Sequence, residues 1–290
     1  MTAHLSTPVL DLAYEQTGDP AGPPVVLLHG FPYDVRAYDE VAAHLPGARV
    51  IVPHLRGFGA TRFRDEGTLR SGQQGALAQD LLDLLDGLRL EKAVVAGYDW
   101  GGRAVCIAAA LWPERIGGLV TVDGYNVQNL AYAGEPAPPE WERTYWYQYY
   151  FHSERGRRGL ERNREELCEL LWRTWSPEWK QAAEAFPASA PSLHNPDFVD
   201  VVIHSYRHRY GLADGDPRYQ DIEDKLAAEP PISVPTIVLE SGADGIGGPS
   251  ATEDREHFTG AYTHRLLPGI GHNVPQEAPA AFAEAVAALI

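Results

Sequence analysis

The stretch that most constrains the fold is VVAGYDWGGR, residues 94–103. It begins with apolar, β-branched residues that are typical of a buried strand, and the alanine-rich residues 103–110 favour a helix. Between them, Gly97 and Gly101 allow a sharp turn without Cβ clashes. The pattern predicts a strand, a tight turn and a helix, with the Asp99 side chain exposed at the tip and the amide of Trp100 directed at the same point.

Composition limits the classes of partner. The 290 residues suffice for one large domain or two smaller ones, and 44% hydrophobic and 22% charged residues are ordinary for a globular protein. With 24 Lys and Arg against 40 Asp and Glu, the formal net charge is −16. A surface this acidic repels nucleic acid and anionic lipid, and it mildly disfavours strongly anionic substrates. We therefore expect no nucleic-acid partner and no membrane partner.

The N-terminus and the cysteines indicate the compartment. Residues 1–8 lack a basic region followed by an apolar stretch, and no window approaches the roughly 18 apolar residues of a membrane span. Cys106 and Cys168 cannot form a disulfide framework, so we expect two free thiols. These features predict a cytoplasmic location.

Strand and helix patterns alternate early in the chain and again near its end, which is typical of a parallel sheet. Five of the seven tryptophans fall between these parts, in helical patterns broken by prolines. Besides the strand before Asp99, the patterns predict strands at residues 9–17, 25–28, 49–52, 116–122, about 235–241 and 263–267, and helices at 38–45, 73–88 and 275–290. We expect a core domain of residues 1–123 and 232–290, and a helical domain of residues 124–231.

Three further motifs stand at the ends of predicted strands. They are HGFP at residues 29–32, GAD at residues 242–244 and GIGH at residues 269–272. With the turn at Asp99, and in this order, they resemble the α/β-hydrolase superfamily, in its branch with an aspartate nucleophile, which contains epoxide hydrolases and dehalogenases. The resemblance implies an α/β-hydrolase fold: a mostly parallel, doubly wound sheet with a helical cap inserted after strand 6.

The resemblance also assigns a catalytic triad. In this family the turn is a nucleophile elbow, which makes Asp99 the nucleophile, Asp244 the triad acid and His272 the catalytic histidine. Asp123 directly follows the sixth predicted strand, where some haloalkane dehalogenases place their acid, and it stays the second choice for that role.

An aspartate nucleophile restricts the reaction. Attack of a carboxylate on an ordinary ester or amide gives a mixed anhydride, a poor intermediate, whereas attack on a saturated carbon gives a stable alkyl ester. An epoxide or a carbon–halogen bond is therefore the expected target. Water activated by His272, which Asp244 orients, would hydrolyse the ester, and the amides of Phe31 and Trp100 would form the oxyanion hole.

Two tyrosines of the predicted cap favour the epoxide. An opening epoxide needs a proton donor, and tyrosine, with an ordinary pKa of about 10, is suitable. Tyr147 begins YQYYF, residues 147–151, which resembles the Tyr-Gln-x-Tyr-Phe stretch of soluble epoxide hydrolases. Tyr206, followed by Arg207, resembles the stretch that carries their second tyrosine. The resemblance implies that both donate a proton; the alternative is that these aromatic residues only fill the core of the cap.

The expected pocket takes a small apolar epoxide or organohalide. The resemblance places Phe31, Pro32, Trp100 and Phe151 in the substrate pocket, with a cis peptide bond before Pro32. No cofactor and no metal are expected. His204 and His208 have i, i+4 spacing, but no glutamate follows His204 as in HExxH, and no third ligand is apparent.

We therefore expect an epoxide hydrolase that makes a vicinal diol through a covalent ester on Asp99. The first alternative is a dehalogenase with the same nucleophile. Haloalkane dehalogenases often carry asparagine where this chain has Phe31, and fluoroacetate dehalogenases use two arginines, of which this chain has only Arg103. The second alternative is a non-catalytic ligand-binding homologue. The sequence leaves open the actual substrate, its stereochemistry and whether the protein forms a homo-oligomer.

Overall fold

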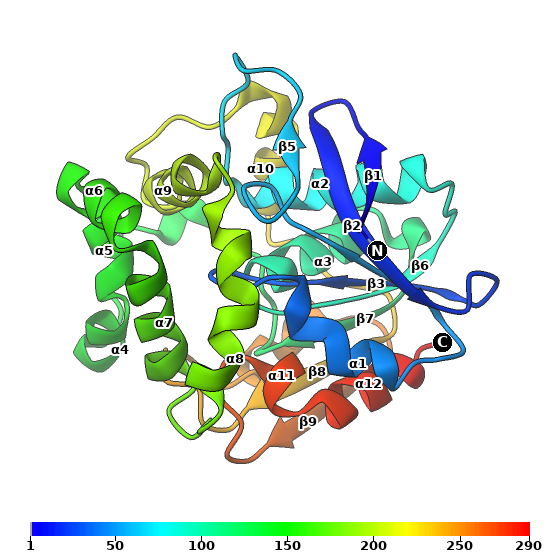
Figure 1. Ribbon diagram of the computed structural model, residues 1–290. Helices are drawn as coiled ribbons and strands as arrows, with labels where there is room; N and C mark the ends of the chain where they lie inside the picture. The colour runs from blue at the N-terminus through cyan, green and yellow to red at the C-terminus, as the bar shows by residue number, and fades with distance from the viewer. Residues whose placement is uncertain (1) are drawn as a thin grey trace.

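The computed structural model describes residues 2–290, which form a single twisted sheet with helices on both faces (Figure 1). The described strands lie in the order β1-β2-β4-β3-β6-β7-β8-β9, and the short β5 pairs with β2. Pairing is antiparallel among β1, β2 and β4, and parallel from β4 through to β9. The strand bounds are β1 Thr2–Ser6, β2 Leu10–Gly18, β3 Pro24–Leu28, β4 Arg49–Pro53, β5 Arg62–Phe63, β6 Ala93–Gly97, β7 Ile116–Val122, β8 Thr236–Ser241 and β9 Tyr262–Leu267.

The central parallel strands are continuous apolar runs because helices cover both of their faces. β6 is buried at all five positions, and β3 at four of its five. By contrast, β1 lies at the edge of the sheet, where exposed and half-buried residues alternate, and its sequence TAHLS does not predict a strand. The predicted α/β-hydrolase fold, with its mostly parallel sheet, is confirmed.

Helices of the core lie in two layers. In Figure 1, α2 (Gln74–Gly87) and α3 (Asp99–Leu111) pack together on one face of the sheet, and α1 (Asp39–Ala43), α11 (Val274–Glu277) and α12 (Pro279–Ala287) on the other. The single C-terminal helix that the sequence predicts is instead two helices. Ala278 between them has φ −138° and ψ 55°, because the residue before a proline is disfavoured in the helical region.

The chain between β7 and β8 forms a group of helices beside the sheet, drawn from green to yellow in Figure 1. β7 is the sixth strand when the two-residue β5 is set aside. The helices are α4 Pro139–Thr144, α5 Trp146–His152, α6 Glu154–Arg162, α7 Arg164–Trp175, α8 Ala182–Ser189, α9 Phe198–His208 and α10 Gln220–Leu226. All seven lie within residues 124–231, although these boundaries of a separate domain stay a prediction.

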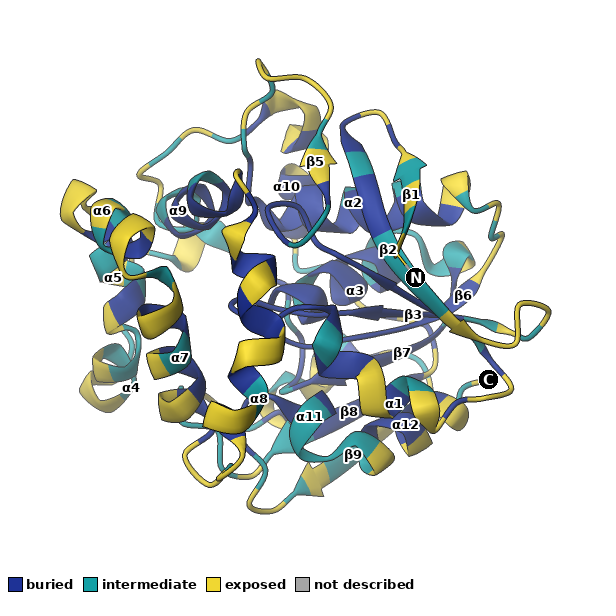
Figure 2. Cartoon of the chain, in the orientation of Figure 1, coloured by how far each residue is buried: buried dark blue, intermediate teal, exposed yellow. Residues whose placement is uncertain are grey.

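Burial shows how the helical insertion meets the core. The inner faces of α7, α8 and α9 are buried, and their outer faces are exposed (Figure 2). Trp172 of α7 is fully buried, and its Nε1 donates a hydrogen bond to the carbonyl oxygen of Pro32 at 2.9 Å. None of the helices in residues 2–290 combines the length and the hydropathy that crossing a bilayer demands.

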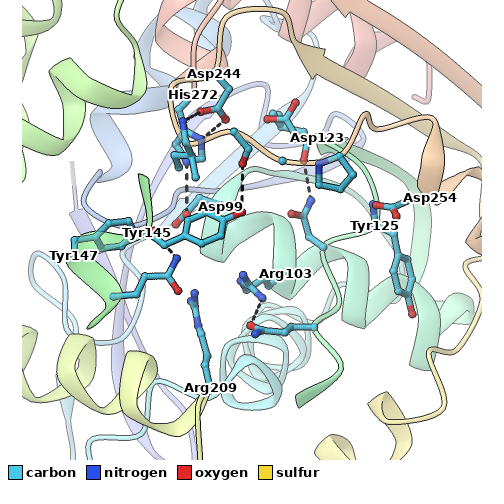
Figure 3. A pocket seen from close by; sticks show the side chains of 18 of the residues that line it. Asp99, Arg103, Asp123, Tyr125, Tyr145, Tyr147, Arg209, Asp244, Asp254 and His272 are labelled. Atoms are coloured by element: carbon cyan, nitrogen blue, oxygen red, sulfur yellow. Dashed lines mark hydrogen bonds and ion pairs between the residues drawn. The ribbon is translucent and has the colours of Figure 1, made fainter. Parts of the chain in front are cut away.

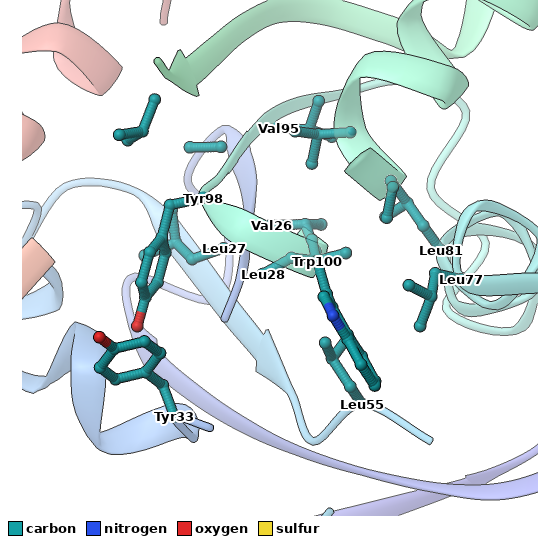
Figure 4. Packing of buried hydrophobic residues seen from close by; sticks show 14 of the residues in the cluster. Val26, Leu27, Leu28, Tyr33, Leu55, Leu77, Leu81, Val95, Tyr98 and Trp100 are labelled. Carbon is teal, nitrogen blue, oxygen red and sulfur yellow. The ribbon is translucent and has the colours of Figure 1, made fainter. Parts of the chain in front are cut away.

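The turn that follows β6 rests on the centre of the hydrophobic core. Figure 4 shows Tyr98 and Trp100 pointing to opposite sides of the strand end, Tyr98 towards Tyr33 and Trp100 towards Leu55. All four side chains are at most 2% exposed. Interiors packed in this way leave little room for rearrangement, so the residue between Tyr98 and Trp100 is held in a defined position.

Candidate active site

The turn after β6 has the predicted geometry. β6 ends at Gly97, Tyr98 is extended, and Asp99 is the first residue of α3. Asp99 itself has φ +51°, a left-handed conformation that is strained for a residue with a Cβ atom and that often marks functional sites. A Cβ on Gly101 would lie 2.0 Å from the carbonyl oxygen of Leu28, so the close approach of β3 to α3 explains why a glycine is needed there. The predicted strand, turn and helix are confirmed.

The two carboxylate oxygens of Asp99 have different surroundings. The backbone N–H of Phe31 donates to Oδ1 at 2.7 Å, and Nε2 of His272 lies 3.6 Å from Oδ2. The peptide bond between Phe31 and Pro32 is cis, as predicted. A Cβ on Gly30 would lie 2.4 Å from Cβ of Asp99, so only glycine permits this approach. Burial alone would raise the pKa of Asp99, but His272 and the Phe31 N–H outweigh it and lower that pKa.

His272 bridges two aspartates. Its Nδ1 lies 2.7 Å from Oδ2 of Asp244, and the other oxygen of Asp244 accepts from the N–H of Ile246 at 2.7 Å. Burial would lower the pKa of His272, but the negative charges of Asp244 and then Asp99 outweigh it and raise that pKa well above its ordinary value. Glu277, which sequence reasoning missed, accepts hydrogen bonds from the backbone N–H groups on either side of His272, at 2.8 and 3.1 Å.

Asp123 lies close to Asp244 and His272, but its hydrogen bonds are to Ser241. Its two oxygens accept from the N–H and the hydroxyl of Ser241, at 2.7 and 2.9 Å. Burial and then the charge of Asp244 raise the pKa of Asp123 to about 7. The structure therefore brings Asp244, and not Asp123, into hydrogen-bond contact with His272, although the catalytic role of either acid stays a prediction.

Three residues of types that can bind a metal ion lie close together at the same place. Ligand atoms of Asp123, Asp244 and His272 lie within 4.8 Å of one another, but hydrogen bonds to Ser241 and between Asp244 and His272 already occupy them. His204, from the histidine pair in the sequence, accepts from the N–H of Gly72 with Nδ1 and lies 3.0 Å from the carbonyl oxygen of Asp214 with Nε2. Both clusters thus have a hydrogen-bonding role within the protein.

A cavity of about 390 Å³ opens above Asp99, between the sheet and the helical insertion (Figure 3). Side chains from both parts line it, and most of them are polar. The lining includes Asp99, Asp123, Asp244, Asp254, His272, Arg103, Arg209, Gln128 and Tyr147. Sequence reasoning missed Arg209 and Gln128, because neither belongs to a motif and nothing local indicates that they approach Asp99.

The predicted pocket residues form the wall behind this cavity instead of its lining. Phe31, Trp100 and Phe151 are fully buried, and Pro32 is buried as well. The ring of Phe31 packs against those of Trp100 and Phe151, with centroids 5.6 and 6.1 Å apart, so these aromatic faces contact one another. None of these four residues lines the described cavity, whose surface is mostly polar, and their place in a substrate pocket stays a prediction.

The two predicted tyrosines come together from α5 and α9. The rings of Tyr147 and Tyr206 meet edge to face with centroids 5.4 Å apart. Tyr147 lines the cavity, and its hydroxyl accepts from Nε2 of Gln148 at 3.1 Å, whereas Tyr206 is 1% exposed and lies just behind. Burial raises the pKa of both tyrosines above the ordinary value, and the charge of Asp99 adds to the effect. Both hydroxyls therefore stay protonated at neutral pH.

The second predicted oxyanion-hole group belongs to the first turn of α3. Trp100 directly follows Asp99, at a position where a backbone N–H has no acceptor within the helix. The Trp100 side chain is fully buried, and its Nε1 has no hydrogen-bond partner among the described residues. Of these two amides, only the Phe31 N–H is in hydrogen-bond contact with the Asp99 carboxyl group, and the role of the Trp100 amide stays a prediction.

Comparisons with known proteins show which proteins this chain is similar to. A family model described as alpha/beta hydrolase fold matches residues 23–279. Epoxide hydrolase A of Mycobacterium tuberculosis is 27% identical over 95% of this chain and 91% of its own length. A crystal structure from Klebsiella pneumoniae, provisionally called an epoxide hydrolase, is 43% identical, with a TM-score of 0.97 over 99% of this chain and 96% of that one. A Pseudomonas aeruginosa structure with the same provisional description shares the fold, at 22% identity and a TM-score of 0.79 over 99% and 94% of the two chains.

Proposed function

The chain belongs to the α/β-hydrolase fold family, and on this premise we propose that it is an epoxide hydrolase, which adds water to an epoxide to give a vicinal diol. The observation that carries the proposal is the presentation of Asp99. One carboxylate oxygen is held by the Phe31 N–H, and the other faces His272 at the cavity. Residues 124–231 would act as the cap that closes this cavity.

The first step is attack by Oδ2 of Asp99 on a ring carbon of the epoxide. A carbon–oxygen bond forms to Asp99, the ring carbon–oxygen bond breaks, and its electron pair stays on the leaving oxygen. Because the pKa of Asp99 is lowered, the attacking group is the carboxylate at neutral pH. The product of this step is an alkyl ester on Asp99.

The leaving oxygen takes a proton from a tyrosine. Tyr147 faces the cavity, and Tyr206 packs against it, so the proposal assigns them as the donating pair. Their raised pKa values keep them protonated until an alkoxide, a much stronger base than a phenolate, develops beside them.

The second step is hydrolysis of the ester. Formation of the ester removes the negative charge of Asp99, which is one of the two charges that raise the pKa of His272. His272 can then pass its proton to the tyrosinate, and the neutral imidazole takes a proton from water, whose oxygen attacks the ester carbonyl. The amides of Phe31 and Trp100 stabilise the oxyanion, each by about 2.7–4 kcal/mol on the scale of other oxyanion holes. Collapse transfers the remaining proton of that water to the leaving alcohol oxygen, which restores the carboxylate, releases the diol and leaves His272 protonated as at the start.

Oxygen-18 labelling in a single turnover tests this sequence. In labelled water, the first turnover should place the label in the Asp99 carboxylate, found by mass spectrometry of the peptide, and leave the diol unlabelled. Label in the diol alone during that turnover would exclude the covalent route. A later turnover should transfer the label from Asp99 to the diol.

A dehalogenase is the second candidate, because Trp100 Nε1 is a buried donor without a partner and could bind a halide. A paired panel of epoxides and haloalkanes, read as diol and halide release, separates the two reactions. Release of halide without diol formation would favour the dehalogenase. Thermal stabilisation by these compounds without any product would instead favour a non-catalytic binding protein.

A further inference from the structure

Two arginine side chains point into the cavity that contains Asp99. Arg103 lies four residues after Asp99 in α3, a spacing that puts both side chains on the same face of the helix. Arg209 directly follows α9 in the helical insertion. In Figure 3, Asp99 lies between these arginines on one side and the pair of Asp244 and His272 on the other.

The acidic and basic groups of the cavity differ in how many hydrogen-bond and ion-pair partners they have within the protein. Each of the four aspartates in the lining accepts a hydrogen bond from a backbone N–H group. Among residues 2–290, the guanidinium of Arg103 bonds only to Oε1 of Gln128, at 3.0 Å, and neither Arg103 nor Arg209 forms an ion pair with a carboxylate. In this cavity, the aspartates therefore already accept hydrogen bonds, whereas the two arginines have no carboxylate partner.

Arg209 is held in a way that leaves its donors available. Its guanidinium carbon lies 4.6 Å from the ring centroid of Tyr206 and 5.8 Å from that of Trp100. Stacking on aromatic faces stabilises a guanidinium through its charge and its plane, without using the N–H groups at its edge. These N–H groups therefore remain able to bind a ligand.

We infer that the substrate carries a carboxylate, which Arg103 and Arg209 bind while the epoxide ring faces Asp99. A guanidinium matches a carboxylate with two parallel N–H donors, and two guanidinium groups on one cavity wall supply more donors than Gln128 can use. The inference rests on the proposed epoxide hydrolysis and adds the class of substrate to it. It also links substrate binding to catalysis, because Arg209 stacks on Tyr206, the proposed proton donor.

Electrostatics within the cavity support the same ligand. Burial and then the charge of Arg209 lower the pKa of Arg103 to about 10, which means that the two cations destabilise each other. A carboxylate bound to both would relieve this repulsion. The net charge of −16 disfavours anions at long range, but salt screens exposed charges more than about 10 Å away, so the charged groups that line the cavity, Arg103 and Arg209 among them, matter more to a bound ligand.

Short terminal epoxy acids of increasing chain length, each paired with its primary amide, test the inference on the whole chain. We expect kcat/KM for the best acid to exceed that of its amide about 10- to 100-fold, as for the loss of a hydrogen bond to a charged group. In Arg103→Gln and in Arg209→Gln, the ratio should fall towards one. Arg207→Gln is the matched control, because Arg207 pairs with Glu154 at 2.8 Å and does not line the cavity, and it should keep the ratio.

The outcomes separate the two proposals. A ratio near one in the unmodified protein, with acids and amides both hydrolysed through Asp99, overturns the carboxylate site and leaves epoxide hydrolysis standing. If no epoxide is hydrolysed, the proposed function fails, and calorimetric titration with hexanoate and hexanamide still tests the site. Roughly tenfold tighter binding of hexanoate that is lost in Arg209→Gln supports the inference, and equal affinities overturn it.

Discussion

The backbone N–H of Phe31 donates a hydrogen bond to Oδ1 of Asp99 at 2.7 Å, although the two residues are 68 positions apart. This contact makes the carboxylate oxygens inequivalent. In the proposed mechanism, Oδ1 already occupies the place where negative charge develops during ester hydrolysis, and Oδ2 is left to face His272 and the cavity. The donor needs no rearrangement between the two steps, which is the property that makes oxyanion holes effective.

Replacing the proposed base should separate the two steps. His272→Gln removes the group that activates water but leaves Asp99 able to attack. We expect one equivalent of epoxide to be consumed and the protein to gain the mass of the substrate, with steady-state turnover lost by at least about 1,000-fold. Intact-protein mass spectrometry detects the ester. The double variant that also carries Asp99→Asn should gain no mass, and a mass gain there would place the ester on another residue.

The two candidate triad acids should respond differently to the same change. Asp244→Asn removes the charge that holds His272 in one orientation, and turnover should fall on the order of 10⁴-fold, as for other triad aspartates. Asp123→Asn keeps two polar atoms beside Ser241, and its effect should be much smaller. Steady-state kinetics at pH 8 compare the variants. A larger loss in Asp123→Asn would reverse the assignment.

Loss of either tyrosine hydroxyl should slow ring opening selectively. Tyr147→Phe and Tyr206→Phe should each lower the rate of ester formation about 10²- to 10⁴-fold, the usual contribution of a general acid. Pre-steady-state quenched flow measures this rate separately from hydrolysis of the ester. Tyr149→Phe, on the exposed face of α5, is the matched control. Unchanged ester formation in both Tyr147→Phe and Tyr206→Phe would show that these rings only fill the cap.

Close packing at the elbow predicts a stability effect. In Gly101→Ala, the new Cβ would lie 2.0 Å from the carbonyl oxygen of Leu28, and we expect the free energy of unfolding to fall by about 1–3 kcal/mol or more. Gly47→Ala is the control, since no atom lies within 4 Å of its new Cβ. Urea denaturation measures both variants. Equal stability of the two would mean that β3 and α3 separate easily.

His54 should make stability depend on pH. It is 8% exposed, neither ring nitrogen has a partner among the described residues, and burial lowers its pKa to about 4. The unfolded chain, with a pKa of about 6.5, takes up the proton first, so this contribution is present above pH 6.5 and is lost as pH falls from 6.5 to 4. Between pH 8 and 5, the unmodified protein should lose about 2 kcal/mol that His54→Gln does not lose.

Chemical denaturation at the two pH values measures this difference. The exposed residue His44 provides the control, because His44→Gln should keep the pH dependence of the unmodified protein. An identical loss in His54→Gln and in the unmodified protein would mean that other groups carry the acid sensitivity.

Short-range patterns in the sequence were sufficient for the frame of the fold. The apolar runs of β3 and β6 and the glycines near Asp99 encode buried strands and a turn through local sterics, which do not depend on the rest of the chain. The break between α11 and α12 at Ala278 also has a local cause, because Pro279 follows it. The sequence did not reveal this break, because apolar residues have helical spacing on both sides of it. By contrast, the sequence of β1 has little of the residue pattern that is typical of strands. This segment becomes a strand through its pairing with β2.

The sequence by itself determined the turn that presents Asp99, the proposed nucleophile, and the motifs that surround it, because motif order along the chain fixes which residues stand at the ends of parallel strands. Only the tertiary structure decided what lines the cavity. Packing took the rings of Phe31 and Trp100 into the wall and brought Arg209, from the helical insertion, to the same cavity as Arg103. Such contacts depend on the shapes of side chains far apart in sequence, and no local periodicity encodes them.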